Sequence, residues 1–175
     1  MSREIKHIAI CLSLLMLAPF SADTFAARGP KNLHARAVYV LTNQTSNTVA
    51  AFRRNAWGML TPAGEFPTGG AGDPTPQSPD PATDPLASQG ALIISHGNRF
   101  LFAVNSGSNQ ISVLKIKKND LELIAVVDSG GIRPISLTLH DDLLYVLNED
   151  GTPNITGFQV DEDGTLTQLA GSLAR

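Results

Sequence analysis

The sequence has 175 residues, of which 42% are hydrophobic and 17% are charged, and its formal net charge at pH 7 is −3. This balance is typical of one soluble globular unit, and the lack of a basic stripe argues against a nucleic-acid partner. The single cysteine, Cys11, lies in an apolar segment near the N-terminus. A chain processed after that segment would have no thiol, which excludes disulfides, thiolate nucleophiles and cysteine metal sites.

Residues 1–26 have the pattern of a secretory signal peptide. Basic residues precede an apolar run at 8–18 that is too short to span a bilayer comfortably, and the small residues Thr24 and Ala26 suit a cleavage site. The alternative is an uncleaved membrane anchor. The signal-peptide interpretation predicts a periplasmic or secreted protein without membrane contact after cleavage, in which residues 27–36 form a flexible linker.

The segment at residues 37–70 is predicted to be part of a first repeated unit, and it contains three short strands. Apolar and β-branched runs are separated by Gly, Asn and Asp, which is typical of consecutive antiparallel strands. The expected strands cover residues 38–43, 48–53 and 60–66. Residues 71–86 contain five prolines. Because proline lacks a backbone N–H and fixes φ, this segment is predicted to be an exposed insertion.

The rest of the chain predicts two complete units of four strands, at residues 87–131 and 132–175. The expected strands of the second unit cover residues 91–94, 100–105, 110–116 and 121–127. Those of the third cover residues 135–139, 143–148, 155–160 and 166–169. No segment after the predicted signal peptide has a sustained helical period, so the processed chain is predicted to be all-β.

The units repeat one another at a spacing typical of propeller blades. Asn105 and Asn148 end equivalent strands and are 43 residues apart, and Asn43 is predicted to hold the same position in the first unit. Phe52 and Phe158 belong to hairpins that match at a spacing of 106 residues. The sequence therefore predicts β-propeller blades of four antiparallel strands, about two and three-quarter of them, in an open, truncated propeller. Remaining blades or self-association are needed to close the ring, because an open arc leaves strand edges and apolar faces in water.

The repeated segments resemble a known family. The segments VYVLTN, FLFAVNSGSNQISVLKI, SGGIRPISLTL and LLYVLNEDGTPNITGFQVDEDGTLTQLAGS are similar to lactonase-type (6-phosphogluconolactonase-like) seven-bladed β-propellers and to the related YVTN repeats. The resemblance covers about residues 37–173 and implies an incomplete copy, since seven blades need on the order of 300 residues. It implies a parent protein that hydrolyses or isomerises a lactone or sugar acid. It also implies a histidine just before the strand at 91–94, where this chain has Ser88-Gln89-Gly90.

Four residues are candidates for a ligand site at the rim where blade links and turns approach the channel: Arg133, Glu149, Asn105 and Asn148. Arg133 can bind a carboxylate or phosphate; the alternative is that it bonds loop carbonyls and holds a blade link. Glu149 can act as a general base; the alternative is a solvated turn carboxylate. The recurrence of Asn favours a strand-capping or turn role over a unique catalytic one.

No motif assigns catalytic residues, a cofactor or a metal site. His96 and His140 are predicted on the opposite rim, and the acidic turn at 161–164 lacks the final bidentate glutamate of a calcium loop. Two functions follow. The first is an exported lactonase-like enzyme that takes a small anionic or lactone ligand. The second is a non-catalytic binding or scaffold propeller of the YVTN type in the periplasm or outside the cell.

Overall fold

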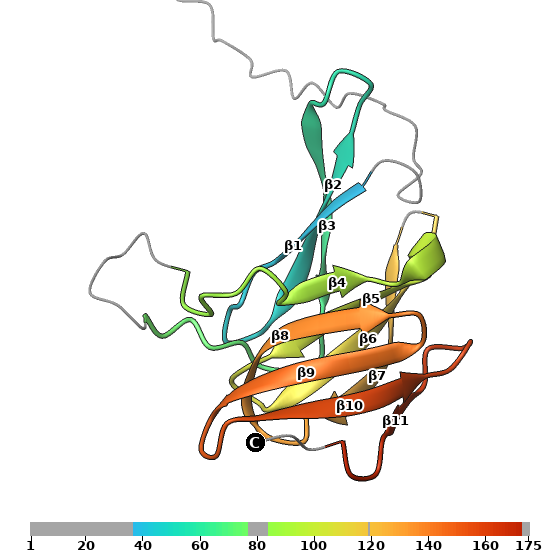
Figure 1. The fold of residues 1–175 in the computed structure, drawn as a ribbon. Coiled ribbons are helices and arrows are strands. Elements are labelled where there is room, and N and C mark those ends of the chain that lie inside the picture. Colours follow the sequence, from blue (N-terminus) through green and yellow to red (C-terminus); the bar gives the residue numbers. More distant parts are fainter. Residues whose placement is uncertain (1–36, 77–83, 119, 173–175) are drawn as a thin grey trace, which may run out of the picture.

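The computed structural model describes residues 37–76, 84–118 and 120–172, which form an almost entirely β structure (Figure 1). Its strands are β1 (Ala37–Leu41), β2 (Thr48–Arg54), β3 (Leu60–Pro67), β4 (Leu92–Ile94), β5 (Phe100–Asn105), β6 (Gln110–Ile116), β7 (Leu121–Asp128), β8 (Ile132–His140), β9 (Leu143–Asp150), β10 (Asn154–Val160) and β11 (Leu166–Gln168). A three-residue 3-10 turn, η1 (His96–Asn98), follows β4. The all-β prediction is confirmed.

The strands form three antiparallel sheets in which each strand pairs with its neighbour in sequence. The first sheet has the order β1-β2-β3, the second β4-β5-β6-β7 and the third β8-β9-β10-β11. Among the described residues, the first sheet has no equivalent of the inner strands β4 and β8. The structure thus confirms two complete blades and three strands of another.

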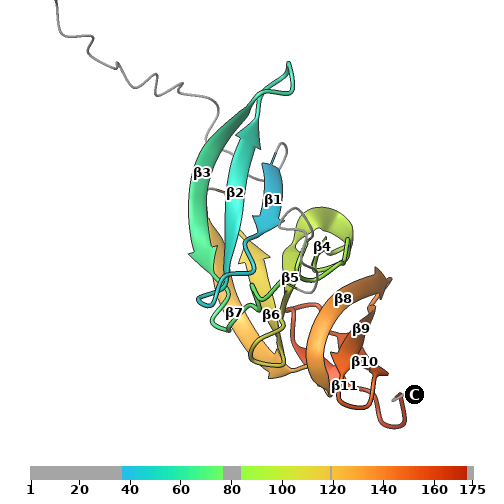
Figure 2. The ribbon, with the colours of Figure 1, turned by 90° about the vertical axis from the view of Figure 1, so that its left-hand side faces the viewer.

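The sheets stack face to face along a curved path, and Figure 2 shows that this path does not return to its start. Two apolar clusters lie between them. Leu101 and Ala103 of β5 pack toward the first sheet, in a cluster with Val49. Phe102 and Val104 of the same strand pack toward the third sheet. Because alternate residues of a strand point to opposite faces, β5 is buried throughout between two neighbours. The described chain is an open arc of propeller blades.

The outer face of the third sheet lacks the cover that the second sheet receives. Tyr145 and Leu147 stand 43 residues after Phe102 and Val104 and point the same way, but their exposed fractions are 36% and 39% against 0%. Ile155, which pairs with Leu147 across β9 and β10, is 42% exposed. These side chains are apolar at the positions where a further blade would stack.

One repeated position differs from the sequence-based alignment. Leu41 pairs with Val49 and Leu147 with Ile155, so the constant spacing of 106 residues makes Thr42 the equivalent of Asn148. Asn43 therefore does not share the position of Asn105 and Asn148, contrary to the prediction. Asn43 lies one residue beyond that shared position, two residues after the end of β1, and its φ is +52.

Several strand ends also differ from prediction. β8 begins at Ile132 rather than at residue 135, and β9 continues to Asp150, because Ile132 pairs with Asp150. Arg133 and Glu149 consequently lie within strand ends rather than in a link and a turn. The predicted signal peptide and linker, and part of the proline-rich insertion, lie outside the described residues. In the described part of the chain, no helix is long and apolar enough to cross a membrane.

Candidate functional site

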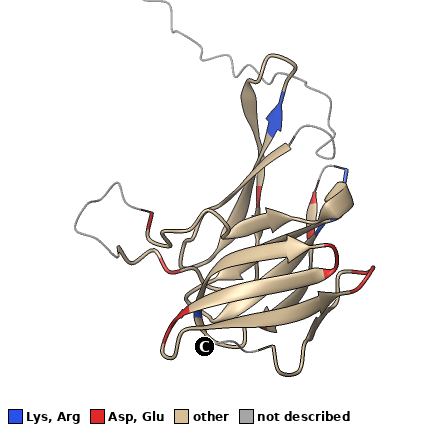
Figure 3. Cartoon of the chain, viewed as in Figure 1, with Lys and Arg blue, Asp and Glu red and all other residues tan. Residues whose placement is uncertain are grey.

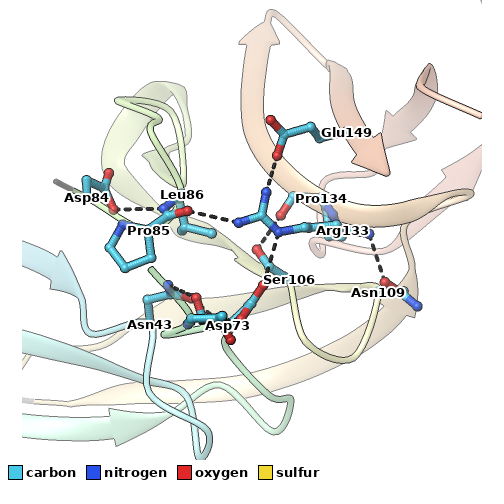
Figure 4. Close-up of polar contacts among 11 residues, drawn as sticks. Asn43, Asp73, Asp84, Pro85, Leu86, Ser106, Asn109, Arg133, Pro134 and Glu149 are labelled. Carbon is cyan, nitrogen blue, oxygen red and sulfur yellow. Dashed lines mark hydrogen bonds and ion pairs between the residues drawn. The ribbon is translucent and has the colours of Figure 1, made fainter. Parts of the chain in front are cut away.

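The candidate site lies at the rim where β1, β5 and β9 end. Asn43, Ser106 and Glu149 occupy equivalent positions of the three repeats, each one residue beyond the Thr or Asn described above. Arg133, near the start of β8, approaches the same rim. Figure 4 shows these side chains converging with the segment that follows the first sheet. The repeat therefore gathers one polar residue from each blade at one place.

Arg133 is the centre of this group. It is 6% exposed, has the left-handed φ of +57, and its backbone N–H donates to Asn109 Oδ1 over 2.8 Å. Its guanidinium donates from Nε to Asp73 Oδ2 over 3.0 Å and from a terminal nitrogen to Glu149 Oε2. The other terminal nitrogen donates to the Pro85 carbonyl over 2.9 Å. A buried guanidinium is costly unless it is paired, and these contacts supply the pairing.

The contacts of Arg133 join three separate parts of the chain. Asp73 and Pro85 belong to the segment between the first and second sheets, Asn109 belongs to the turn between β5 and β6 of the second sheet, and Glu149 belongs to the third sheet. A non-glycine residue with positive φ is uncommon and persists only where its surroundings hold it. Arg133 thus connects the blade link to the third sheet, and it also keeps a carboxylate beside the rim.

The two carboxylates differ in their surroundings. Hydrogen bonds from Thr75, and then from Arg133, hold the pKa of Asp73 below its ordinary value. The Asp73 backbone is fixed by Asn43, whose Nδ2 donates to the Asp73 carbonyl over 2.6 Å and whose Oδ1 accepts from its N–H over 2.9 Å. The Glu149 side chain is 46% exposed. Asp73 is therefore a fixed structural anion, and Glu149 is the carboxylate that solvent or a ligand can reach.

A cavity of about 230 Å³ lies between β1 and the chain that leads into β4, and Asn43, which fixes the Asp73 backbone, is among its lining residues. Tyr39 and Leu41 form an apolar wall, while Asp84, Ser88 and Gln89 supply polar groups. Asp84 is turned toward its own loop, where it accepts from the backbone N–H of Leu86 over 3.0 Å. Ser88 and Gln89 thus line this cavity where the family resemblance implies a histidine.

Asn105 and Asn148 do not reach this site. Both are fully buried between sheets. Asn105 Nδ2 donates to Ser112 Oγ over 2.6 Å, and its Oδ1 accepts from Thr68 and Asn47 over 2.7 and 3.0 Å. Asn148 Nδ2 donates to the Ser129 carbonyl over 3.2 Å and to Asn154 Oδ1 over 2.9 Å. These bonds tie each strand end to the preceding blade link.

The same blade links contain glycines at the points where the asparagine side chains leave no room for a Cβ. A Cβ on Gly70 would lie 2.4 Å from Asn105 Cγ, and a Cβ on Gly131 would lie 2.6 Å from Asn148 Cγ. Of the four candidates, the structure brings Arg133 and Glu149 together and places Asn105 and Asn148 in the blade interfaces. Asp73 and Pro85 were missed, because nothing in a proline-rich segment predicts which of its groups returns to the sheet.

The opposite rim has a larger cavity of about 380 Å³ between the second and third sheets. His96, Arg99, Asp142 and Glu162 are among its lining residues. His140 is 91% exposed at its side chain and lies 3.6 Å from Asp141. No group of three or more His, Cys, Asp or Glu side chains in the described ranges is arranged to hold a metal ion.

Comparison with known proteins finds the same repeat. The family model described as lactonase, seven-bladed β-propeller, matches residues 33–174. Uncharacterized proteins of Staphylococcus aureus are 34% identical over 82 residues, which cover 44% of this chain and 24% of theirs. The chain thus spans about a quarter of the length of these curated relatives.

Two solved structures show the same fold. A protein from Lactobacillus plantarum is 24% identical with a TM-score of 0.58, over 75% of this chain and 37% of that one. The periplasmic gluconolactonase of Pseudomonas aeruginosa is 20% identical with a TM-score of 0.58, over 82% of this chain and 39% of that one. At these identities the likeness concerns the fold.

Proposed function

Because this chain belongs to the lactonase family of seven-bladed β-propellers, we propose that it forms part of the ligand-binding rim of a propeller that hydrolyses or isomerises a lactone or sugar acid. The observation that carries the proposal is the pair made by Arg133 and Glu149. A buried arginine in a strained backbone conformation holds a half-exposed carboxylate at the rim. Strained residues and convergent polar groups of this kind are concentrated at functional sites.

The chemistry of hydrolysis suits these two groups. Glu149 takes a proton from a water molecule whose oxygen attacks the lactone carbonyl carbon, and it returns that proton to the ring oxygen when the C–O bond breaks. A guanidinium has five N–H groups, and contacts with described residues use three of those of Arg133. The two N–H groups that these described contacts do not use can donate to the developing oxyanion or to a carboxylate of the ligand.

We place this activity outside the cytoplasm and in a closed ring. The N-terminal pattern predicts export, and the gluconolactonase with a similar fold is described as periplasmic. The uncovered side chains of the third sheet, including Leu147, support a need for remaining blades or for self-association. A complete channel mouth requires those blades as well.

A non-catalytic binding or scaffold propeller is the second candidate, and specific contacts favour it. Arg133 already has Asp73, Glu149 and the Pro85 carbonyl as partners, which is the arrangement of a structural clamp. The cavity between β1 and the chain that leads into β4 has Ser88 and Gln89 where the family resemblance implies a histidine. A propeller of this kind would bind a ligand at the rim without turning it over.

Hydrolysis of δ-gluconolactone by the assembled propeller distinguishes the two functions. The assembly is the full chain in its self-associated form or joined to its remaining blades. We expect turnover above spontaneous hydrolysis, with kcat/KM reduced by about 100-fold or more in Glu149→Gln, since positioned acid–base groups contribute about 10²–10⁴-fold. Asp141→Asn, on the opposite rim, is the matched control and should leave turnover unchanged. A folded assembly without turnover would favour the scaffold.

A further inference from the structure

The outer turn of the first sheet, residues 55–59, exposes apolar side chains with no partner among the described residues. Trp57 is 88% exposed and Met59 is 66% exposed, and Trp57 is the only tryptophan of the sequence. Figure 1 shows that the hairpin of β2 and β3 projects beyond the other two sheets. Large apolar side chains that stand together on an exposed tip mark an interaction surface.

The third sheet contains the same turn and serves as an internal comparison. The turn at residues 161–165 has the same length and the same hydrogen bonds: Gly58 N–H donates to the Asn55 carbonyl over 3.1 Å, and Gly164 N–H donates to the Asp161 carbonyl over 2.9 Å. Both glycines have positive φ, +85 and +94. The equivalents of Trp57 and Met59 in this turn are polar, Asp163 and Thr165. The turn therefore folds without apolar residues at these positions.

A preceding blade would not cover these side chains. In the third sheet, Gly164 packs against Phe100 of the preceding blade, yet Asp163 and Thr165 remain exposed. The first-sheet turn would acquire the same cover at Gly58 only, leaving Trp57 and Met59 in water. Their exposure therefore does not arise from the open end of the arc.

The charge of the turn is also reversed between the two sheets. Arg53 and Arg54 stand at the base of the first-sheet turn, and neither is in an ion pair with a described residue. The third-sheet turn has instead three acidic residues, Asp161, Glu162 and Asp163. Figure 3 shows the end of β2 in blue and the third-sheet turn in red.

From these differences we propose that residues 53–59 form a site that binds the surface of an anionic lipid membrane. The tip projects from the sheet with its apolar side chains in the turn, and the two cations stand at its base on opposite faces of β2, Arg54 exposed and Arg53 partly buried. This order matches a bilayer surface, where anionic headgroups cover the acyl chains and where Trp prefers the boundary between them. Contact of this kind is peripheral, and it differs from the expectation that the processed chain has no membrane contact. It is independent of the lactone chemistry proposed for the opposite end of the strands.

Trp57 provides a reporter that no other part of the chain can mimic. The full chain is mixed with vesicles of phosphatidylcholine, with or without phosphatidylglycerol, and Trp57 emission is followed with brominated lipids as quenchers. We expect a blue shift and quenching with the anionic vesicles, both weakened by high salt. Because quenching requires the tip to be at the acyl boundary, binding through the apolar N-terminal segment alone would not produce it.

Variants that keep a tryptophan test the assignment. Arg53→Gln with Arg54→Gln should weaken vesicle binding about 25-fold, since each cation near an anionic surface contributes about fivefold. Lys117→Gln with Lys118→Gln removes the same charge from the second sheet and should change little. Moving the reporter, by Trp57→Asp with Asp163→Trp, should abolish quenching. The proposal would be overturned by an equal loss of vesicle binding in both charge variants, or by quenching of a tryptophan at the third-sheet turn. It would also be overturned if, without vesicles, Trp57 emission shifted to the blue as the protein concentration rises.

Discussion

Replacing Gly70 with alanine tests the contacts that join the first two blades. The new Cβ would lie 2.4 Å from Asn105 Cγ and 2.5 Å from Asn105 Nδ2. Asn105 is fully buried and bonded to Asn47, Thr68 and Ser112, so it cannot move without breaking those bonds. Overpacking costs about 1–3 kcal/mol and an unpaired buried polar atom costs about 1–3 kcal/mol. We expect Gly70→Ala to lower the free energy of unfolding by about 2–6 kcal/mol, the sum of the two costs.

Urea denaturation of the full chain, followed by circular dichroism, measures this loss. Gly97→Ala is the control, because its Cβ meets no atom within 4 Å and only its φ of +77 opposes the substitution. We expect that control to cost about 1–2 kcal/mol. In an Asn105→Ala background, which removes two of the three closest atoms, Gly70→Ala should cost at least about 1 kcal/mol less. Additive effects, within about 0.5 kcal/mol, would refute the steric explanation.

Two further predictions concern the rim and the open face. Hydrogen bonds from Thr75, and then from Arg133, lower the pKa of Asp73 in the folded chain. The Asp73 carboxylate therefore stabilises the fold fully at pH values above its pKa in the unfolded chain, which is about 3.9. This stabilisation is lost as the pH falls through the lower pKa of the folded chain. Asp73→Asn should therefore lose part of the difference in urea midpoint between pH 7 and pH 3, and an unchanged difference would contradict this role. On the outer face of the third sheet, Leu147→Asp should reduce self-association in sedimentation measurements, whereas Asp141→Asn should not; equal association of both variants would show that the copies meet elsewhere.

The sequence predicted the strands and their grouping well because the pattern is local. Short apolar runs with polar turns determine antiparallel neighbours, and the spacings of 43 and 106 residues relate one blade to the next. The placement of Asn43 was wrong for an instructive reason. The identity of the residue was taken as the marker, whereas strand pairing makes Thr42 the equivalent of Asn148. Register follows from backbone pairing and from which face is buried, and a matching residue type one step away does not preserve it.

The contacts of the candidate site were less accessible to prediction. Glu149 was assigned to the rim with Arg133 because blade topology places both there. Asp73 precedes Arg133 by 60 residues and lies in a segment without periodicity, so no pattern relates them. The direction of the Arg133 side chain depends on its positive φ, which sequence rules assign to Gly, Asn or Asp rather than to Arg. A long-range contact that depends on an irregular backbone has no local sequence signal.

Repetition within the chain separates the structural residues from those that give each blade its own chemistry. At the rim, one position holds Asn43, Ser106 and Glu149, which bond respectively to the Asp73 backbone, the Pro134 carbonyl and the Arg133 guanidinium. At the outer turn, one position holds Trp57 in one sheet and Asp163 in another on the same backbone. The fold requires only a residue that suits the turn or strand end at each position. The departures from that requirement, a carboxylate beside a strained arginine and a tryptophan in water, are therefore where binding functions should be sought.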